Sequence, residues 1–432
     1  MLEMRKMKDS GIEWIGEIPE GWEIIPVKYL AKYNYDTLAE SCSPDFEFSY
    51  IDIGSVTYTD GITNYQNFKF KDAPSRARRI VHSGDILVST VRTYLRAVAC
   101  VNEHRLPQIA STGFLVLQAD ISKIHPHFLM YSVLSDNFIC KVEANSVGIS
   151  YPAINASQIV HFKLPIPQLS EQFLLVTYLD RQCSEIDALL SKTLSSIEEY
   201  KKLKQAVITQ AVTKGVRGER EMKDSGVEWI GEIPKEWVCE KIKYATSISR
   251  GLFNHRPRND ERYYNGKYPF IQTGDVANAT KYIVSYSQTL NELGKSVSKE
   301  FPKGTLTMTI AANVGDVAIL NFDAYFPDSV VGFVPNKNIR TLYLFYVFSA
   351  MKDEFIRTAI KSTQLNLNID RVKETFIPVT LNVNEQCEIE NYLESKCAEI
   401  DRLIAKKEQL VKELESYKKS LIYEVVTGKR EV

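Results

Sequence analysis

Long apolar runs are absent from this sequence of 432 residues. None approaches the ~20 residues that cross a bilayer as a helix, and residues 1–20 lack the apolar core of a secretory signal. We therefore expect a chain with no membrane contact that stays in the cytoplasm, where it is made. A hydrophobic content of 44% and a charged content of 25% fit an ordinary globular protein of two or three domains.

Cysteine and histidine are few and scattered. The seven cysteines include no C-x-x-C pair, and the six histidines form no cluster with zinc-ligand spacing. This pattern argues against zinc modules and favours free thiols in a reducing compartment. The net charge of −1 gives no overall attraction to nucleic acid, so any binding to DNA has to rest on local basic patches.

Catalytic signatures are also missing. The sequence has no G-x-x-x-x-G-K-[ST] phosphate loop, no G-x-G-x-x-G motif and no G-x-S-x-G nucleophile turn. It lacks the Asn/Asp-Pro-Pro-Tyr/Phe tetrapeptide with which amino-methyltransferases hold a target adenine. Pro44-Asp45 and Pro327-Asp328 are not followed by the nearby Glu/Asp-x-Lys of a nuclease. We expect a chain without a catalytic site, a bound cofactor or a metal.

Tryptophan occurs four times, and all four lie in two copies of one segment. The segment MKDSGIEWIGEIPEGW at residues 7–22 returns as MKDSGVEWIGEIPKEW at residues 222–237, and 13 of the 16 positions are identical. The offset of 215 residues is that of a whole domain with its connector, too long for a solenoid repeat. We therefore interpret the chain as a tandem duplication.

The repeated segment has its own local signal. Ser10-Gly11-Ile12-Glu13 has the S-x-x-E form of a capping box, and Gly16 follows one turn later. This pattern predicts a short capped turn that carries Trp14, followed by a second anchor at Trp22. Two interpretations stay open: a clamp that seats each domain on its neighbour, or simply a well-capped start of a domain.

Weaker similarity continues beyond the repeated segment. Residues 83–100 (SGDILVSTVRTYLRAVAC) match 303–320 (KGTLTMTIAANVGDVAIL), and their Val, Ile and Thr content after a glycine predicts strands. Aromatic-rich stretches at 127–138 and 342–355 predict helices. Each half is therefore expected to be a mixed α/β domain. No polar constellation is seen to recur in both halves, which argues against an enzyme with two sites.

Proline and glycine vanish from residues 171–213 and 385–427. There the side chains follow a 4-3 spacing typical of coiled coils. The positions are Ile186, Leu190, Thr193, Ile197, Tyr200, Lys204, Val207 and Ala211, then Ile400, Ile404, Lys407, Val411, Leu414, Lys418, Leu421 and Val425. Each helix would be about 60 Å long and would end near a glycine. The alternative is two amphipathic helices that each lie on their own domain.

These patterns define the predicted architecture. The fold class is α+β, with two pseudo-repeated mixed α/β domains separated by an antiparallel coiled coil of two long helices. The predicted boundaries are 1–168 for the first domain, 169–215 for the central helix, 216–382 for the second domain and 383–432 for the C-terminal helix. Cys183 and Cys397 lie at matching places in the helices, and we interpret both as small buried hydrophobic residues.

Basic, amide and aromatic residues gather in segments that do not match between the halves. Lys and Arg contact phosphates, and Arg, Asn and Gln can read purine edges in the major groove. The candidate DNA-binding residues are Lys69, Lys71, Arg76, Arg78, Arg79, Arg92, Tyr94, Arg96, Ser150, Tyr151 and Asn155 in the first half, and Arg250, Arg256, Arg258, Arg262, Tyr263, Gln364, Asn366, Asn368 and Arg371 in the second. Taken singly, each cluster could be ordinary solvated surface. A repeated frame with unlike loops instead favours two heads that read different half-sites. We expect 149–159 and 362–372 to lie on loops or helix starts.

At this point the sequence resembles the specificity subunits of type I restriction–modification systems. The resemblance spans the whole chain and rests on DSGIEWIGEIPEGW with its copy, GDILVSTVRTYLR, PIPQLSEQFLLVTYLDRQCSEIDALL, and the Val-Thr-Lys-Gly that ends the central helix. One departure is that the second half has IPVTLNVNEQ where the first has LPIPQLSEQ, so the second proline is missing. This difference leaves the direction in which the second long helix starts uncertain.

The resemblance implies two target-recognition domains and a cytoplasmic, non-catalytic subunit. Its implied partners are double-stranded DNA, two methyltransferase subunits and restriction subunits. S-adenosylmethionine, ATP and Mg²⁺ would then be held by the partner subunits, which would methylate adenine N6 and cut DNA. Two other classes stay open on the sequence alone, namely a stand-alone DNA endonuclease and a protein-binding scaffold.

Overall fold

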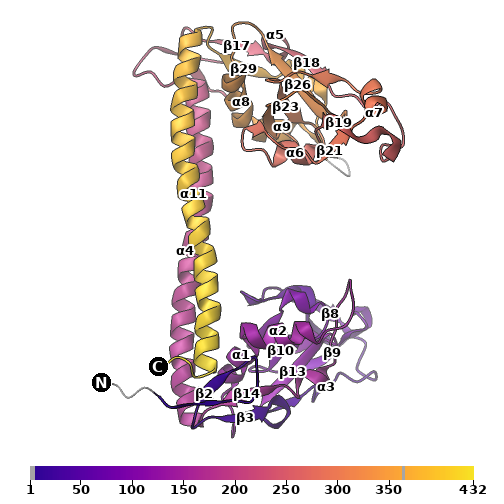
Figure 1. Cartoon of the computed structure of the whole chain (residues 1–432), viewed down its shortest axis with the longest axis vertical. Coiled ribbons are helices and arrows are strands. Elements are labelled where there is room, and N and C mark those ends of the chain that lie inside the picture. The colour runs from indigo at the N-terminus through magenta and orange to yellow at the C-terminus, as the bar shows by residue number, and fades with distance from the viewer. Residues whose placement is uncertain (1–4, 362–364) are drawn as a thin grey trace. The chain divides into compact units, whose positions relative to one another are not determined.

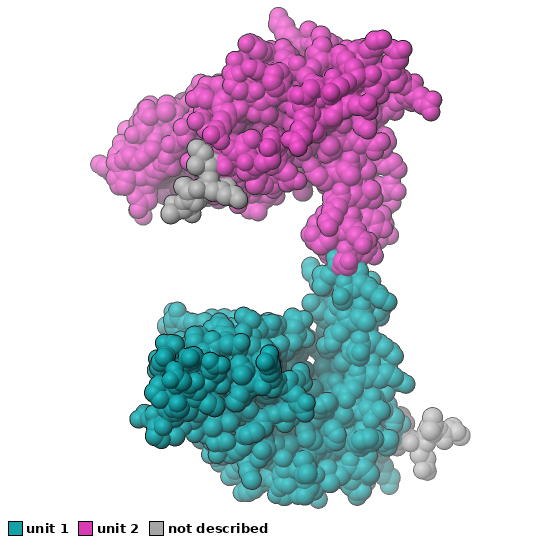
Figure 2. Space-filling view, turned by 180° about the vertical axis from the view of Figure 1, so that it is seen from behind, with its two compact units in different colours: residues 1–194, 409–432 teal, residues 195–408 magenta. Residues whose placement is uncertain are grey.

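The computed structural model describes residues 5–361 and 365–432. These residues fall into two compact units, which divide the chain between 194 and 195 and again between 408 and 409 (Figure 2). Unit 1 holds the N-terminal part and the end of the chain, and unit 2 holds the middle. Two long helices, α4 (Leu169–Lys214) and α11 (Val383–Val426), contribute to both units (Figure 1).

Unit 1 is built on two four-stranded sheets. The first has the strand order β11 (Val98–Cys100), β10 (Ile86–Ser89), β13 (Phe114–Ala119), β4 (Ala31–Tyr33), and the second β8 (Gln66–Lys69), β5 (Glu47–Ile51), β12 (Gln108–Ser111), β9 (Ala77–Val81). Two-stranded pairs are β1 (Met7–Asp9) with β2 (Glu17–Pro19), β3 (Glu23–Pro26) with β14 (Lys163–Ile166), and β6 (Val56–Thr57) with β7 (Gly61–Ile62). The short helices are α1 (Pro126–Leu134), α2 (Asp136–Ala144) and α3 (Ala156–Ile159).

Unit 2 repeats this plan with additions. Its larger sheet has the order β18 (Thr246–Arg250), β26 (Val330–Pro335), β23 (Leu306–Thr309), β24 (Val317–Leu320), β20 (Tyr282–Ile283), and its second sheet β21 (Gln288–Leu290), β19 (Tyr264–Phe270), β25 (Ala324–Tyr325), β22 (Glu300–Phe301). Two-stranded pairs are β15 (Met222–Asp224) with β16 (Glu232–Pro234), β17 (Val238–Lys241) with β29 (Phe376–Val379), and β27 (Ile360–Lys361) with β28 (Leu365–Asn366). The short helices are α5 (Ile242–Ala245), α6 (Thr273–Ala277), α7 (Glu292–Ser296), α8 (Thr341–Ala350), α9 (Lys352–Thr358) and α10 (Ile369–Glu374).

The two units share one topology, as the duplication predicts. The second sheet of each contains one parallel pair, β5 with β12 and β19 with β25, flanked by antiparallel neighbours. The stretches 83–100 and 303–320 each form a hairpin, β10–β11 and β23–β24, rather than one strand. Each predicted aromatic helix is two helices with a break, at Ser135 and at Met351.

The long helices pair antiparallel, as predicted. In unit 1, Lys418 Nζ of α11 donates to Asp187 of α4 at 2.6 Å, and in unit 2, Lys204 Nζ of α4 donates to Asp401 of α11 at 2.7 Å. From the first pair to the second, the residue number rises by 17 in α4 and falls by 17 in α11, so the two helices run in opposite directions. The residues of the 4-3 pattern are buried or half-buried. The predicted α+β fold class, with two mixed domains and two paired long helices, is confirmed.

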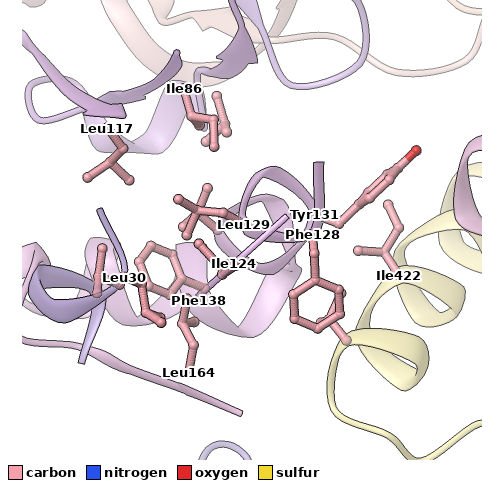
Figure 3. Packing of buried hydrophobic residues seen from close by; sticks show 14 of the residues in the cluster. Leu30, Ile86, Leu117, Ile124, Phe128, Leu129, Tyr131, Phe138, Leu164 and Ile422 are labelled. Atoms are coloured by element: carbon pink, nitrogen blue, oxygen red, sulfur yellow. The ribbon is translucent and has the colours of Figure 1, made fainter. Parts of the chain in front are cut away.

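The core of unit 1 joins its first sheet to both long helices. Leu30, Ile86 and Leu117 pack with α1 and α2, and Ile422 of α11, whose ribbon is yellow in Figure 3, lies beside Tyr131. Unit 2 has the matching core, in which Phe333 and Phe348 pack with Ile208 of α4 and Leu393 of α11. Each domain thus buries a helix of its own and one from the other half of the sequence.

The repeated segment clamps these helices within its own unit. In unit 1, Trp22 Nε1 donates to Glu171 at the start of α4 at 3.2 Å, and a Cβ on Gly428, just past the end of α11, would lie 2.4 Å from Pro19. In unit 2, Trp237 Nε1 donates to Glu385 at the start of α11 at 3.1 Å. The segment therefore anchors the long helices of its own unit, and the seating of one domain on the other stays a prediction.

The predicted capping box is wrong in detail. The Ser10 hydroxyl accepts from the Ile12 amide at 3.1 Å instead of the Glu13 amide, and Asp9 accepts from Gly11 at 3.0 Å. Ser10 and its neighbours form a loop between β1 and β2, so no regular helix follows that a box could cap. A turn with Trp14 in it does form, because the Ile12 carbonyl accepts from the Gly16 amide at 2.9 Å.

The missing second proline does not change how α11 starts. The buried Gln386 side chain donates to the Thr380 carbonyl at 2.8 Å, as Gln172 donates to the Pro167 carbonyl at 2.9 Å. The Thr380 hydroxyl also donates to Glu385 at 2.9 Å, a bond that proline cannot make. The two long helices are therefore anchored in the same way.

Candidate nucleic-acid interface

Four segments of unit 1 are joined by backbone hydrogen bonds into one continuous edge. The Thr112 amide donates to the Arg76 carbonyl at 2.8 Å, and the Thr90 amide donates to the Gly113 carbonyl at 2.8 Å. The Ile154 amide in turn donates to the Thr90 carbonyl at 2.9 Å. Segments 76–79, 90–96 and 150–155, which the sequence singled out separately, are therefore neighbours.

The most accessible candidates of unit 1 lie at this edge. Arg92 adopts φ 51°, and its guanidinium lies 5.1 Å from the centroid of the Tyr151 ring. The Tyr94 and Tyr151 side chains are 54% and 67% exposed, and Ser150 is exposed as well. An arginine stacked on an exposed aromatic ring keeps its in-plane donors free for a ligand. Asn155 instead caps α3 in a capping box with Gln158.

Several other candidates in unit 1 already have partners within the fold. Arg96 binds Asp136 at 2.5 Å and Glu143 at 3.0 Å, which fixes the β10–β11 loop on α2. Lys69 and Lys71 lie 3.6 and 3.1 Å from Asp45. Arg78 packs on the Phe70 ring, and burial lowers the pKa of the Arg79 guanidinium. Lys69, Lys71 and Arg76 are nevertheless exposed.

Unit 2 has the corresponding edge with different side chains. The Ile310 amide donates to the Ser329 carbonyl at 2.9 Å, and the Leu367 amide donates to the Ile310 carbonyl at 2.8 Å. Ala312, with φ 62°, stands where unit 1 has Arg92, since both follow the matching hairpin strand. Asn366 is exposed at this edge, and Asn368 caps α10 by accepting from the Asp370 amide at 2.8 Å.

Three arginines of unit 2, Arg250, Arg256 and Arg258, lie around Asp328, the residue before Ser329. Arg250 Nε donates to the Asp328 carbonyl at 2.6 Å, Arg258 forms an ion pair with its carboxylate, and Arg256 Nη2 lies 3.5 Å from Oδ2. A Cβ on Gly251 would lie 2.2 Å from the Pro327 carbonyl, so only glycine allows the loop to pass this close. Sequence spacing could not reveal this cluster, because Asp328 is 70 residues from Arg258.

The remaining candidates of unit 2 are more dispersed. Arg262 binds Asp260 at 2.6 Å, and the ring of Tyr263 stacks on His255 at 4.0 Å between centroids. Arg371 Nη1 donates to the Thr358 carbonyl at 2.9 Å. Gln364 lies outside the described residues.

Polar constellations do recur in both halves, and the contrary expectation is wrong. Arg5 with Trp22 and Glu171 recurs as Arg220 with Trp237 and Glu385, and Tyr131 with Asp180 recurs as Tyr346 with Glu394. The sequence did not reveal these pairs, because the partners are far apart in the chain. They join each domain to its long helix and hold it there. Among the described residues, no helix is long and apolar enough to cross a membrane.

Comparison with known proteins gives the family. The model of the type I restriction modification DNA specificity domain matches residues 19–199 and 248–414. Over 449 aligned residues the chain is 26% identical to the MjaX type I restriction enzyme specificity subunit of Methanocaldococcus jannaschii, with 99% of this chain and 98% of that protein covered. It is 23% identical to the MjaVIII specificity subunit of the same organism, with 95% and 93% covered.

Solved structures agree on the fold. A chain from a structural study of complex assembly and conformational transition of the type I R-M system aligns with a TM-score of 0.77 at 21% identity, covering 96% of this chain and 99% of that one. The HsdS subunit from Thermoanaerobacter tengcongensis aligns with a TM-score of 0.51 at 21% identity, covering 96% and 98%. The chain therefore belongs to the type I restriction–modification DNA specificity family, and it carries two copies of the family's domain.

Proposed function

We propose that this chain reads a two-part, asymmetric DNA site as the specificity subunit of a type I restriction–modification complex, with one half-site read by each domain. The proposal rests on one observation: the two domains share the same backbone fold but present different side chains at the equivalent edge. Unit 1 presents Arg92 on Tyr151, whereas unit 2 presents arginines around Asp328 beside Asn366. Different side chains on equivalent backbone supply different hydrogen-bond patterns to base edges, which is what two unlike half-sites require.

The long helices would set the gap between the half-sites. Their antiparallel register is supported by Lys418 on Asp187 and Lys204 on Asp401. Each domain packs on both long helices within its own unit. A helix lengthens by ~1.5 Å per residue, so the helices act as a spacer of fixed length between the half-sites.

The chemistry would belong to partner subunits. The family's specificity subunits are non-catalytic, and this chain lacks the nucleotide-binding motifs and the tetrapeptide with which amino-methyltransferases hold a target adenine. Two methyltransferase subunits would methylate adenine N6 with S-adenosylmethionine, and restriction subunits would use ATP and Mg²⁺. We place the assembly in the cytoplasm. The alternatives of a stand-alone endonuclease and a protein scaffold gain no support from the relatives.

Inserting four residues, about one helical turn, into both long helices tests the spacer. The insertions follow Leu194 in α4 and Leu410 in α11, which face each other in the register set by the Lys–Asp pairs. The added length of ~6 Å should widen the gap by one or two base pairs and leave both half-sites unchanged. Base-resolution methylation mapping in cells that express the chain with its methyltransferase reads the outcome. A changed half-site would refute the spacer role.

Replacing Gln364 and Asn366 by alanine tests the recognition edge of unit 2. The substitutions should relax one half-site alone, by ~1–3 kcal/mol for each bidentate contact that is lost. Arg92→Ala should relax the other half-site, and it serves as the matched control. If the methylation pattern of the double variant equals that of the wild type, these two residues do not read bases.

A further inference from the structure

Asp328 contacts all three arginines of the cluster in unit 2, Arg250, Arg256 and Arg258. Its carbonyl accepts from Arg250, and its carboxylate faces Arg256 and Arg258. The three arginines come from the end of β18 and the loop that follows, whereas Asp328 precedes β26. One carboxylate against three guanidinium groups leaves a net positive charge, so the cluster still suits a polyanion.

The arginines are held but remain accessible. The side chains of Arg256 and Arg258 are 54% and 46% exposed, and that of Asp328 is 34% exposed. Arg256 Nη1 also donates to the carbonyls of Phe253 and His255 at 2.6 and 2.8 Å. A guanidinium has five donors, so both side chains keep donors for a further ligand. Their orientation is fixed before that ligand arrives, which reduces the entropy lost on binding.

The cluster belongs to unit 2 alone. In the strand register, Val330 of unit 2 corresponds to Phe114 of unit 1, so Asp328 corresponds to Thr112, which has no carboxylate. Ile248 and Tyr33 pair with the matching residues Phe333 and Leu117, so Arg250, two residues after Ile248, corresponds in sequence to Tyr35. The Tyr35 hydroxyl instead donates to Asp85 at 2.7 Å. A feature confined to one copy of a duplicated domain fits a role in which the two copies differ.

Building on the proposed function, we propose that Asp328 is a positioning residue that holds Arg256 and Arg258 in the orientation that reads guanine in the half-site of unit 2. Guanine is favoured over phosphate because its O6 and N7 are read by a planar fork in one orientation. A backbone phosphate can be contacted from a wider range of directions and carries no sequence information, so a fixed arginine orientation matters less there. The adjacent Ser329–Ile310–Leu367 backbone places the cluster beside Asn366, at the edge proposed to face the groove.

The test uses the complete chain with its methyltransferase and base-resolution methylation mapping. Arg258→Ala identifies the half-site of unit 2 as the half that it relaxes. Asp328→Asn, which keeps the shape and removes the charge, should relax guanine positions in that same half by roughly 5- to 150-fold relative to the cognate site. Glu221→Gln removes one charge from an exposed pair with Lys235 in the same unit, and it should leave the motif unchanged.

A double-mutant cycle separates positioning from folding. In an Arg256→Ala/Arg258→Ala background, Asp328→Asn should change the motif no further, because Asp328 acts through those arginines. Additive effects, a motif that Asp328→Asn leaves intact, or a uniform fall in methylation without relaxed specificity would each overturn the proposal. Thermal unfolding of each variant shows whether it is folded. A wild-type methylation motif that is not bipartite would contradict the proposed function. The role of Asp328 is tested separately, because each variant is compared with the wild type on the motif that the wild type methylates.

Discussion

Glu171 and Glu385 occupy equivalent positions but differ in burial. The Glu385 side chain is 1% exposed and accepts from Arg220 at 2.6 Å, from Trp237 and from Thr380. The Glu171 side chain is 30% exposed and accepts from Arg5 at 2.5 Å and from Trp22. The same three residue types thus face different amounts of water in the two units.

Replacing each glutamate by glutamine should show this difference. Glu385→Gln leaves Arg220 without its buried countercharge and should destabilise unit 2 by ~3–5 kcal/mol. Glu171→Gln should cost unit 1 only ~1 kcal/mol, because water can solvate Arg5 in place of the carboxylate. Urea unfolding followed by tryptophan fluorescence measures both, since Trp22 and Trp237 contact the glutamates. Equal losses would show that burial does not govern these pairs.

Cys183 and Cys397 of the long helices are buried, as their matching positions in the sequence predicted. Burial raises the pKa of the Cys183 thiol to about 11 and also raises the pKa of Cys397. The fold therefore favours the protonated thiol. Its contribution to stability is present below pH 9, the ordinary value, and is lost as the pH rises toward 11.

The rate of thiol labelling with a maleimide should differ between the buried Cys183 and the exposed Cys140. At pH 8 the exposed Cys140 should react quickly, whereas Cys183 should react at least ~100-fold more slowly and speed up about tenfold for each pH unit. Mass spectrometry of tryptic peptides reports the two sites separately. Labelling of Cys183 as fast as that of Cys140 in the folded protein would contradict the assigned burial.

At the scale of elements, the register of the paired helices depends on two lysines, Lys204 and Lys418, at seam positions where a coiled coil usually has apolar residues. Lys204 and Lys418 occupy seam positions, yet each lies along the partner helix and reaches an aspartate with its amino group. The duplication makes the two pairs equivalent, since Asp187 and Asp401 also match in the repeat. A single contact type therefore fixes the register twice.

Charge reversal should test this register. Asp187→Lys places two positive charges together and should destabilise the helix pair by ~0.5–1 kcal/mol. Adding Lys418→Asp should recover most of that loss, and the equivalent cycle at Asp401 and Lys204 should behave alike. Thermal unfolding at low ionic strength measures the effect, which added salt should reduce. Failure of the second substitution to compensate would show that these residues do not set the register.

At the scale of the whole molecule, the chain repeats one plan, a domain followed by a long helix, and the two long helices run antiparallel. DNA half-sites read by identical heads in such an arrangement would be inverted repeats. The two halves differ in their edges and in the elements that unit 2 adds, such as β20.

Making the two domains identical should make the target symmetric. Residues 23–166, from β3 to β14, would be replaced by residues 238–379, from β17 to β29, while both copies of the repeated segment and both helices are kept. The hybrid should methylate an inverted repeat of one natural half-site with the original gap. Methylation mapping decides the outcome, and a direct repeat would contradict this prediction. The reciprocal hybrid, with two copies of residues 23–166, is the matched control.

The sequence by itself determined the duplication and predicted the α+β class, the two long helices and their antiparallel pairing, which the contacts between α4 and α11 confirmed. These features rest on hydrophobic periodicity and on the positions of tryptophan, glycine and proline. Such patterns involve residues that are close together in the sequence, so they can be recognised without the fold. The recurring Arg–Trp–Glu clamp, the approach of 150–155 to Arg92, the partners that occupy Arg96, and the convergence on Asp328 were decided only by the tertiary structure. Each depends on contacts between distant segments, and spacing along a chain carries no information about which distant charges will meet.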